Sequence, residues 1–427
     1  MPSLRELSTN CVDHPAQDSG VSLPGNKRNE SEVARPAFRV SGLAVMCLIG
    51  ISLTLMLFGK KLIFSEGVED FTGFWIGAKL LGTPYLYDVP GNLELQQATV
   101  ATTKEDLIYV QPPFLAAAVR PLTLLSYMQA MVFWKLLLMV ALIAFVWIFP
   151  ASPRSYAAIA VCWSLPASIA VAFGNDSPLI LLLIALSLLC WKNGREYLAG
   201  AMLGLCLVKF HFLTLLPLVL LRREYRRPLT GFMAVATTLI SINFLVQPDW
   251  VHLYWQALTL PQRNMNGFPM RMPNFYASFF WTGHPAFGVV LGAFLVISIL
   301  WPVCRRLPFE VAVPLCILGG MLISPHTNHL DGLLAIPALL TVAHRWPRLR
   351  PMAWIALSPA VAWLYCVGPP TWGPAFFVAL SLRIMYLVSR ESIPSDRGCE
   401  QTGGGDRARH RLNVIASARS LVVTPPV

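Results

Sequence analysis

Long apolar runs separated by short polar stretches recur along almost the whole chain. A run of this kind is typical of a helix that crosses a membrane, and we interpret about ten of them as spans. They are residues 41–58, 126–149, 156–173, 179–191, 229–246, 286–304, 311–323, 330–343, 352–367 and 375–388. The pattern predicts an all-α polytopic membrane protein.

One apolar segment, residues 198–221, lies between two basic clusters, at residues 192–195 and 222–227, and is interrupted by Lys209. If both clusters face the cytoplasm, the segment enters and leaves the membrane on the same side. We therefore favour a re-entrant hairpin of two short helices with Lys209 near its tip. A single span is the alternative.

A polar insertion, residues 60–113, follows the first apolar run. Apolar residues early in it recur at helical spacing and predict a helix with one apolar face. They are Phe71, Phe74, Trp75, Ala78 and Leu81. Such a helix is typical of one that lies on a membrane surface. Asp70 stands at or just before its N-terminus, where it either caps the helix or acts as a general base at the membrane surface.

Composition supports a membrane protein, since 55% of the residues are hydrophobic and only 13% are charged, about half the charged fraction of a soluble chain. The net charge of +11 comes from short basic clusters beside apolar runs, a placement that indicates membrane orientation and not nucleic-acid binding. The nine cysteines show no metal-ligand spacing, so we expect neither a disulfide framework nor a structural zinc site.

Three parts follow from these patterns. Residues 1–38 and 391–427 are polar and lack periodicity, so we predict disordered cytoplasmic tails, the second of them basic. Residues 39–390 form the transmembrane domain. A cytoplasmic N-terminus places most basic clusters on one side of the membrane. The polar stretches around Asp70, Asn175, Asn274 and His326 then share the opposite, outward face, which predicts an active site that opens there.

Several motifs follow one another in an order that resembles a known family. They are DFTGFWIGAKLLGTPYLYD, YVQPP, GNDSP, NGREYLAGAMLGLCLVKFHF, RREYRR and SPHTNHLD, spread over residues 40–390. This order resembles the membrane glycosyltransferases of the GT-C fold, and specifically the polyprenyl-phosphate-mannose-dependent mannosyltransferases of glycosyltransferase family 87. The resemblance implies a GT-C-like fold with interfacial helices in the first outward loop.

The resemblance also implies an inverting transferase whose base is an Asp of that loop, the position of Asp70 here. A sugar hydroxyl is a poor nucleophile until a nearby carboxylate can accept its proton. The leaving group is a lipid phosphate, whose growing charge needs cationic or hydrogen-bonding partners. Lys209, His326 and His329 are the candidates, because a Lys within an apolar segment is costly unless it faces a cavity or an anion.

Four further polar residues on the outward face are candidates for binding sugar hydroxyls: Tyr109, Gln111, Asn175 and Asn274. Asn175 stands in the GNDSP motif where the family more often has Gln, a difference that bears on substrate identity more than on reaction type. Two His and one Asp near His326 fall short of a convincing metal site. We predict no metal ligands and no cofactor.

The sequence thus predicts transfer of a hexose, with mannose favoured, from a polyprenyl-phosphate donor to an outer-leaflet lipid or glycan acceptor. Its partners would be these substrates and membrane lipids, with no nucleic acid. We expect a multi-pass protein of the plasma membrane with both termini in the cytoplasm. A transporter or lipid-linked sugar flippase is the alternative, to which Lys209 and the hairpin are also suited. A non-catalytic assembly subunit, in which Asp70 only caps a helix, is a third possibility.

Overall fold

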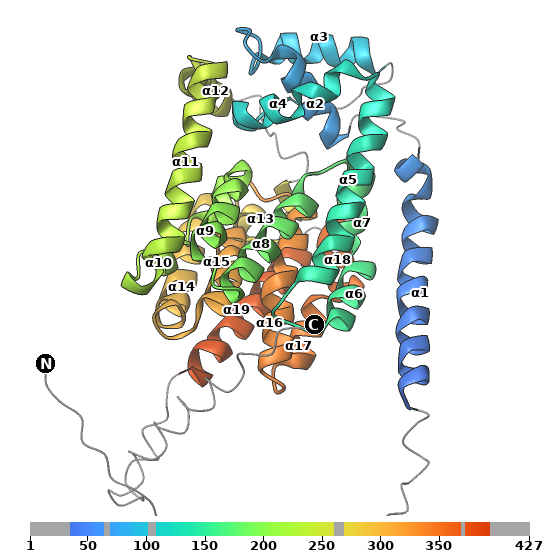
Figure 1. Ribbon diagram of the computed structural model, residues 1–427, viewed down its shortest axis with the longest axis vertical. Coiled ribbons are helices and arrows are strands. Elements are labelled where there is room, and N and C mark those ends of the chain that lie inside the picture. The colour runs from blue at the N-terminus through green and yellow to red at the C-terminus, as the bar shows by residue number, and fades with distance from the viewer. Residues whose placement is uncertain (1–34, 64–68, 101–107, 260–268, 369–371, 393–427) are drawn as a thin grey trace, which may run out of the picture. The chain divides into compact units, whose positions relative to one another are not determined.

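The computed structural model describes residues 35–63, 69–100, 108–259, 269–368 and 372–392, and every regular element within these ranges is a helix (Figure 1). The two predicted tails lie outside the described residues, apart from the few residues where the first and last helices extend into them. The chain divides into two compact units, Met1–Ala44 and Val45–Val427. Apart from residues 35–44, every feature discussed below lies in the second unit.

The helices of the first half are α1 (Arg35–Ile63), α2 (Asp70–Leu80), α3 (Val89–Thr99), α4 (Pro113–Val119), η2 (Arg120–Leu124), α5 (Tyr127–Ile148), α6 (Arg154–Cys162), α7 (Leu165–Phe173), α8 (Ser177–Lys192), α9 (Glu196–Leu205) and η3 (Cys206–Leu213). Those of the second half are α10 (Pro217–Leu220), η4 (Arg223–Tyr225), α11 (Arg226–Val246), α12 (Trp250–Thr259), η5 (Pro269–Arg271), α13 (Phe275–Phe280), α14 (Pro285–Arg306), α15 (Phe309–Ile323), η6 (His329–Ala335), α16 (Ile336–Arg345), α17 (Arg350–Ala356), α18 (Pro359–Cys366) and α19 (Gly373–Glu391).

Four helices of the described chain are long and apolar enough to cross a membrane: Tyr127–Ile148, Glu196–Leu213, Arg223–Val246 and Pro285–Arg306. The pair α6 and α7, bent by 62°, would make a fifth if it forms one span. Several other expected spans are shorter or broken helices. For example, the run at residues 352–367 is divided between α17 and α18, where Ser358 and Pro359 begin a new helix. The structure thus indicates a membrane protein but does not confirm ten spans or a GT-C arrangement.

The segment predicted as a hairpin does turn back on itself. Two contacts indicate that α9 lies antiparallel to α8. Near the end of α8, Ser187 Oγ donates to the carbonyl oxygen of Ala199, near the start of α9, at 2.8 Å. Lys209, which follows α9, donates to Ser177 at the beginning of α8. The chain then comes back to the start of α9, where Arg227 lies 3.6 Å from Glu196. Both ends of the segment therefore lie together, with Lys209 near the turn. Its place within a membrane stays a prediction.

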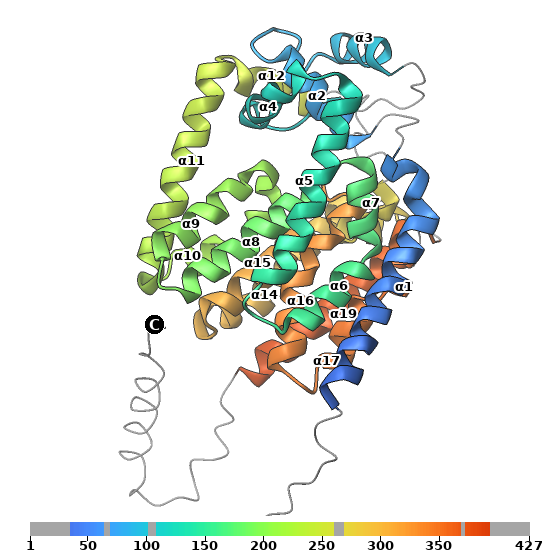
Figure 2. The same cartoon turned by 45° about the vertical axis from the view of Figure 1, so that its right-hand side comes forward.

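Helices α2, α3 and α4 group together at the end of the fold where α11 meets α12, as both views show (Figures 1 and 2). Polar side chains fix this group to α11: Gly82 N–H donates to Gln247 Oε1 at 2.9 Å, and Phe114 N–H donates to Asn243 Oδ1 at 2.7 Å. Asp88 caps α3 by accepting from Gly91 N–H at 2.8 Å. The group forms a small helical layer that carries Asp70.

The prediction that the helix after Asp70 has only one buried, apolar face is wrong, while its location at a membrane surface stays a prediction. Every residue of α2 from Phe71 to Ala78 is buried, including Thr72 and Gly77 on the side expected to be polar. The physical reason is that protein covers both sides: the Tyr109 ring packs directly on Gly77, where a Cβ atom would lie 2.2 Å from it, and Thr72 Oγ1 hydrogen-bonds the Tyr127 hydroxyl at 2.6 Å.

Candidate functional site

Asp70 is the first residue of α2, and the residue before it holds the capping position. Glu69 has the extended backbone of an N-cap, with φ −118° and ψ 162°, and its N–H donates to Thr72 Oγ1 at 3.1 Å. The simple capping role for Asp70 is therefore taken by Glu69. Asp70 is half-buried, and its carboxylate lies at the positive end of the helix dipole.

The GNDSP motif brings an amide to this carboxylate. Helix α7 ends at Gly174, whose φ of +69° favours glycine, and a Cβ atom there would meet Phe71 Cβ at 2.8 Å. Trp134 Nε1 fixes the turn by donating to the Gly174 carbonyl oxygen at 2.8 Å. The next residue, Asn175, donates from Nδ2 to Asp70 Oδ2 at 2.6 Å. The two predicted residues, distant in sequence, are thus in direct contact.

Lys209 reaches the same motif from the hairpin. Its backbone leaves helical geometry, with φ −117° and ψ 57°, and its side chain is buried. The ammonium donates to Asn175 Oδ1 at 3.2 Å and to Ser177 Oγ at 2.7 Å. It also lies 2.9 Å from Asp176 Oδ1 and forms a hydrogen-bonded ion pair with Asp331. Three N–H donors thus meet four acceptors, so Lys209 is fully engaged here.

Asp331 completes the cluster from η6, and sequence reasoning did not select it or Ser177. One Asp331 oxygen accepts from Ser177 Oγ at 2.6 Å, and the other accepts from Asn328 N–H at 2.7 Å. The available signals were the Asp that closes SPHTNHLD and the Ser within GNDSP. Both motifs are evident in the sequence, but their contact across the fold is not.

The network fixes which way the Asn175 amide points. Its Oδ1 atom accepts from Ser177 N–H at 3.0 Å, Ser177 Oγ at 2.6 Å and Lys209 Nζ at 3.2 Å. Because donors surround the oxygen, the NH₂ group is the one that faces Asp70. The cluster therefore presents Asp70 with a fixed hydrogen-bond donor.

Burial raises the pKa of Asp70 from 3.8 to about 6. The Asn175 hydrogen bond and the Lys209 charge act in the opposite direction, and the Asp176 and Asp331 carboxylates add to the rise. A carboxyl group with this pKa is ionised near neutral pH and is a stronger base than an ordinary aspartate. These are the properties required of a general base.

The two predicted histidines flank the Asp331 end of the cluster. His329 begins η6 and is half-buried, while His326 is exposed in the preceding loop. Burial lowers the pKa of His329 to about 4, with the Asp331 and Arg271 charges acting in opposite senses. A neutral His329 can donate a hydrogen bond to a phosphate oxygen but carries no charge near pH 7.

The other three predicted sugar-binding residues are not joined to this cluster by any described hydrogen bond. The buried Tyr109 hydroxyl donates to Pro112 O at 2.6 Å and accepts from Ala116 N–H at 3.0 Å. Asn274, fully buried, caps α13 through Ala277 N–H at 2.9 Å and donates to Ser324 O at 2.7 Å. Gln111 is half-buried. The first two hold the fold together in this structure.

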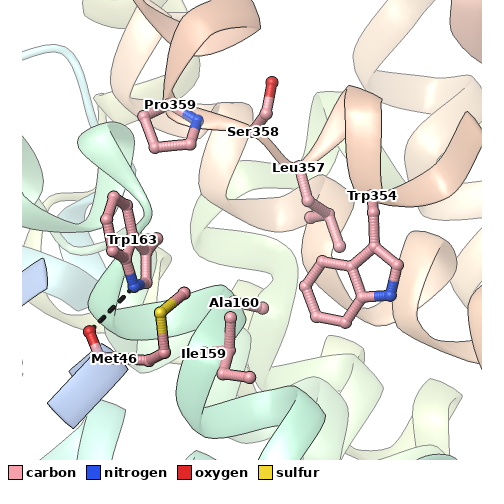
Figure 3. A pocket seen from close by; sticks show the side chains of 8 residues that line it. All are labelled: Met46, Ile159, Ala160, Trp163, Trp354, Leu357, Ser358 and Pro359. Carbon is pink, nitrogen blue, oxygen red and sulfur yellow. Dashed lines mark hydrogen bonds between the residues drawn. The ribbon is translucent and has the colours of Figure 1, made fainter. Parts of the chain in front are cut away.

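A cavity of about 180 Å³ lies elsewhere, between α1, α6, α17 and α18 (Figure 3). Its lining is almost wholly apolar, with Met46, Trp163 and Trp354 among the residues, and the Trp163 indole donates to the Met46 carbonyl oxygen at 3.0 Å. It offers no charged group to a sugar phosphate. Within the described ranges, no group of three His, Cys, Asp or Glu side chains is placed to hold a metal ion.

Comparison with known proteins identifies the family. The sequence profile of glycosyltransferase family 87 matches residues 109–325, just over half of the 427-residue chain. The matched region contains Asn175 and Lys209, while Asp70 and His329 lie on either side of it. No curated protein and no solved structure matches the chain. The motif order of the sequence and this profile agree, and the chain belongs to glycosyltransferase family 87.

Proposed function

We propose that this membrane glycosyltransferase moves a hexose from a polyprenyl-phosphate donor to a lipid or glycan acceptor in the outer leaflet, with inversion at the transferred carbon. The family resemblance favours mannose as the sugar. The observation that carries the proposal is the Asp70–Asn175 contact of 2.6 Å within the buried Lys209 cluster. It joins a carboxylate of raised pKa to a polar network built from four separate segments.

Asp70 accepts the proton of the acceptor hydroxyl in this mechanism. The hydroxyl oxygen forms a bond to C1 of the sugar while the bond from C1 to the phosphate oxygen breaks. The electron pair of that bond leaves with the phosphate, and a single displacement inverts C1. The raised pKa of Asp70, about 6, supports this role because proton transfer is efficient when the base has a pKa near the working pH.

The departing phosphate needs hydrogen-bond donors. His329 and His326 are our first candidates, because they lie in the loop and helix that carry Asp331. Lys209 can contact a phosphate only after it gives up one of its present bonds, since its ammonium already meets Asp331, Ser177 and Asn175. We therefore assign Lys209 first to holding the Asn175 amide, and to phosphate contact only once the donor has displaced one partner.

The test is transfer of label from radiolabelled polyprenyl-phosphate mannose, with the purified protein in nanodiscs and a lipid extract of native membranes as acceptor. Asp70→Asn should abolish transfer while the variant stays folded. Asp88→Asn is the matched control, because Asp88 caps α3 and an Asn can do the same. Full transfer in Asp70→Asn would remove Asp70 as the base. Movement of the labelled donor across vesicles without sugar transfer would instead favour a flippase.

A further inference from the structure

Helix α5 carries a buried charge that the proposed reaction does not use. Lys135 lies within the apolar helix Tyr127–Ile148, and it and Glu69 are each only 3% exposed. The Lys135 ammonium donates to Glu69 Oε1 at 3.1 Å and lies 2.8 Å from Oε2. A charged group within an apolar helix is costly and usually has a functional reason. Breaking such a buried pair on one side leaves an uncompensated charge.

Two consecutive residues of α5 make matching contacts. Lys135 holds Glu69, whose next residue is the proposed base Asp70. Trp134 donates from Nε1 to the carbonyl oxygen of Gly174, whose next residue is Asn175. The Trp134 ring also stacks on Phe71 at a centroid distance of 5.6 Å. One turn of a single helix thus fixes both chain segments immediately before the two side chains that meet at 2.6 Å.

We propose that Lys135, through Glu69, is a positioning residue that together with Trp134 sets the place and orientation of the Asp70 carboxylate against Asn175. The proposal rests on the proposed role of Asp70 as base. Lys135 does not touch the substrate in this account. Rigid helices hold catalytic geometry better than loops do, and α2 and the α7–α8 turn are both tied to α5.

The pair also keeps the neighbourhood of Asp70 electrically balanced. The charges that act on Asp70 are those of Lys209, Asp176 and Asp331, while the Glu69–Lys135 pair is neutral as a whole. Loss of Lys135 alone would remove one positive charge beside the Glu69 carboxylate, one residue from the base. A like charge disfavours ionisation, so the base would then need a higher pH to work. Loss of both charges would remove that effect.

The test measures transfer from polyprenyl-phosphate mannose across pH for Lys135→Met, Glu69→Gln/Lys135→Met and Trp134→Phe, each per folded protein. Lys135→Met should lower kcat by about tenfold to hundredfold, leave the donor KM within about threefold, and raise the acidic limb of the pH–rate profile by about one pH unit. The double variant should return the limb to its wild-type position. Trp134→Phe, which keeps an aromatic ring and loses the donor to Gly174, should also lower kcat.

A purely structural pair predicts something different: Lys135→Met would yield less folded protein, with unchanged kcat and an unchanged limb in the fraction that folds. That result overturns the proposal. Asp70→Asn is run in parallel. If it stays fully active, the proposed base is wrong and the inference falls with it; if it is inactive while Lys135→Met behaves as wild type, only the positioning role fails.

Discussion

The hydrogen bond from Asn175 to Asp70 should control the pH at which the enzyme becomes active. Asn175→Ala removes the Nδ2 donor that lies 2.6 Å from Asp70 Oδ2 and leaves the carboxylate half-buried. This donor is the largest of the influences that hold the pKa of Asp70 down against burial. Its loss must therefore raise that pKa above about 6.

The size of the change follows from the strength of the bond. A hydrogen bond to a charged group contributes about 1.5–3 kcal/mol, and about 1.4 kcal/mol corresponds to one pKa unit. The acidic limb of the pH–rate profile should therefore shift to higher pH by about one to two units. The base works when deprotonated, so the variant should lose most activity below pH 7 and approach wild-type behaviour as the pH rises.

The assay is the pH dependence of label transfer, measured as kcat/KM, which reports the free enzyme. Ser177→Ala is the matched control, because it removes the Oγ donor to Asn175 Oδ1, keeps the backbone N–H donor, and leaves the Nδ2 contact with Asp70 in place. The acidic limb of the pH–rate profile of this variant should stay near that of the wild type. An unchanged limb in Asn175→Ala, with activity otherwise reduced, would refute the argument that this amide tunes the base.

Three further outcomes are expected. Gly200→Val should prevent correct folding, because even a Cβ atom there would lie 1.7 Å from the Pro228 carbonyl oxygen; Gly59→Ala, with nothing within 4 Å, is the neutral control in a thermal unfolding assay. Asn274→Ala should lower stability by about 1–3 kcal/mol without changing donor KM, and a raised KM with full stability would restore its sugar-binding role. A cysteine at the exposed Tyr85, in a cysteine-free background, should react with an impermeant maleimide from outside intact cells, and labelling only after permeabilisation would reverse the topology.

Two of the predicted residues that the structure brings into one cluster are each unusual in their local setting. Lys209 stands out in an apolar segment, and Asp70 precedes a helix that the spacing of aromatic residues predicts. The shape of the hairpin followed from two basic clusters. Each of these predictions depends on residues that are close together in the sequence. Periodicity and the placement of charges are therefore enough to make it.

The parts that sequence reasoning missed depend on contacts between distant segments. Ser177 and Asp331 are 154 positions apart, and Glu69 and Lys135 are 66 apart. The prediction that α2 buries only one face was wrong for the same reason, since its pattern gave no sign that Tyr109 and Tyr127 cover the other side. The sequence also gives no sign that Tyr109 and Asn274 hydrogen-bond backbone groups; their sugar-binding roles stay predictions.

The cluster around Asp70 is unequal in charge, and this bears on how the enzyme would use its donor. Asp70, Asp176 and Asp331 provide three carboxyl groups, against the single ammonium of Lys209. A sugar phosphate that enters beside them adds further negative charge, which disfavours ionisation of Asp70. The base would then hold its captured proton more strongly after transfer, and the departing phosphate would compete with Asp331 for Lys209. In the proposed mechanism, base strength and phosphate binding would therefore be coupled through Lys209.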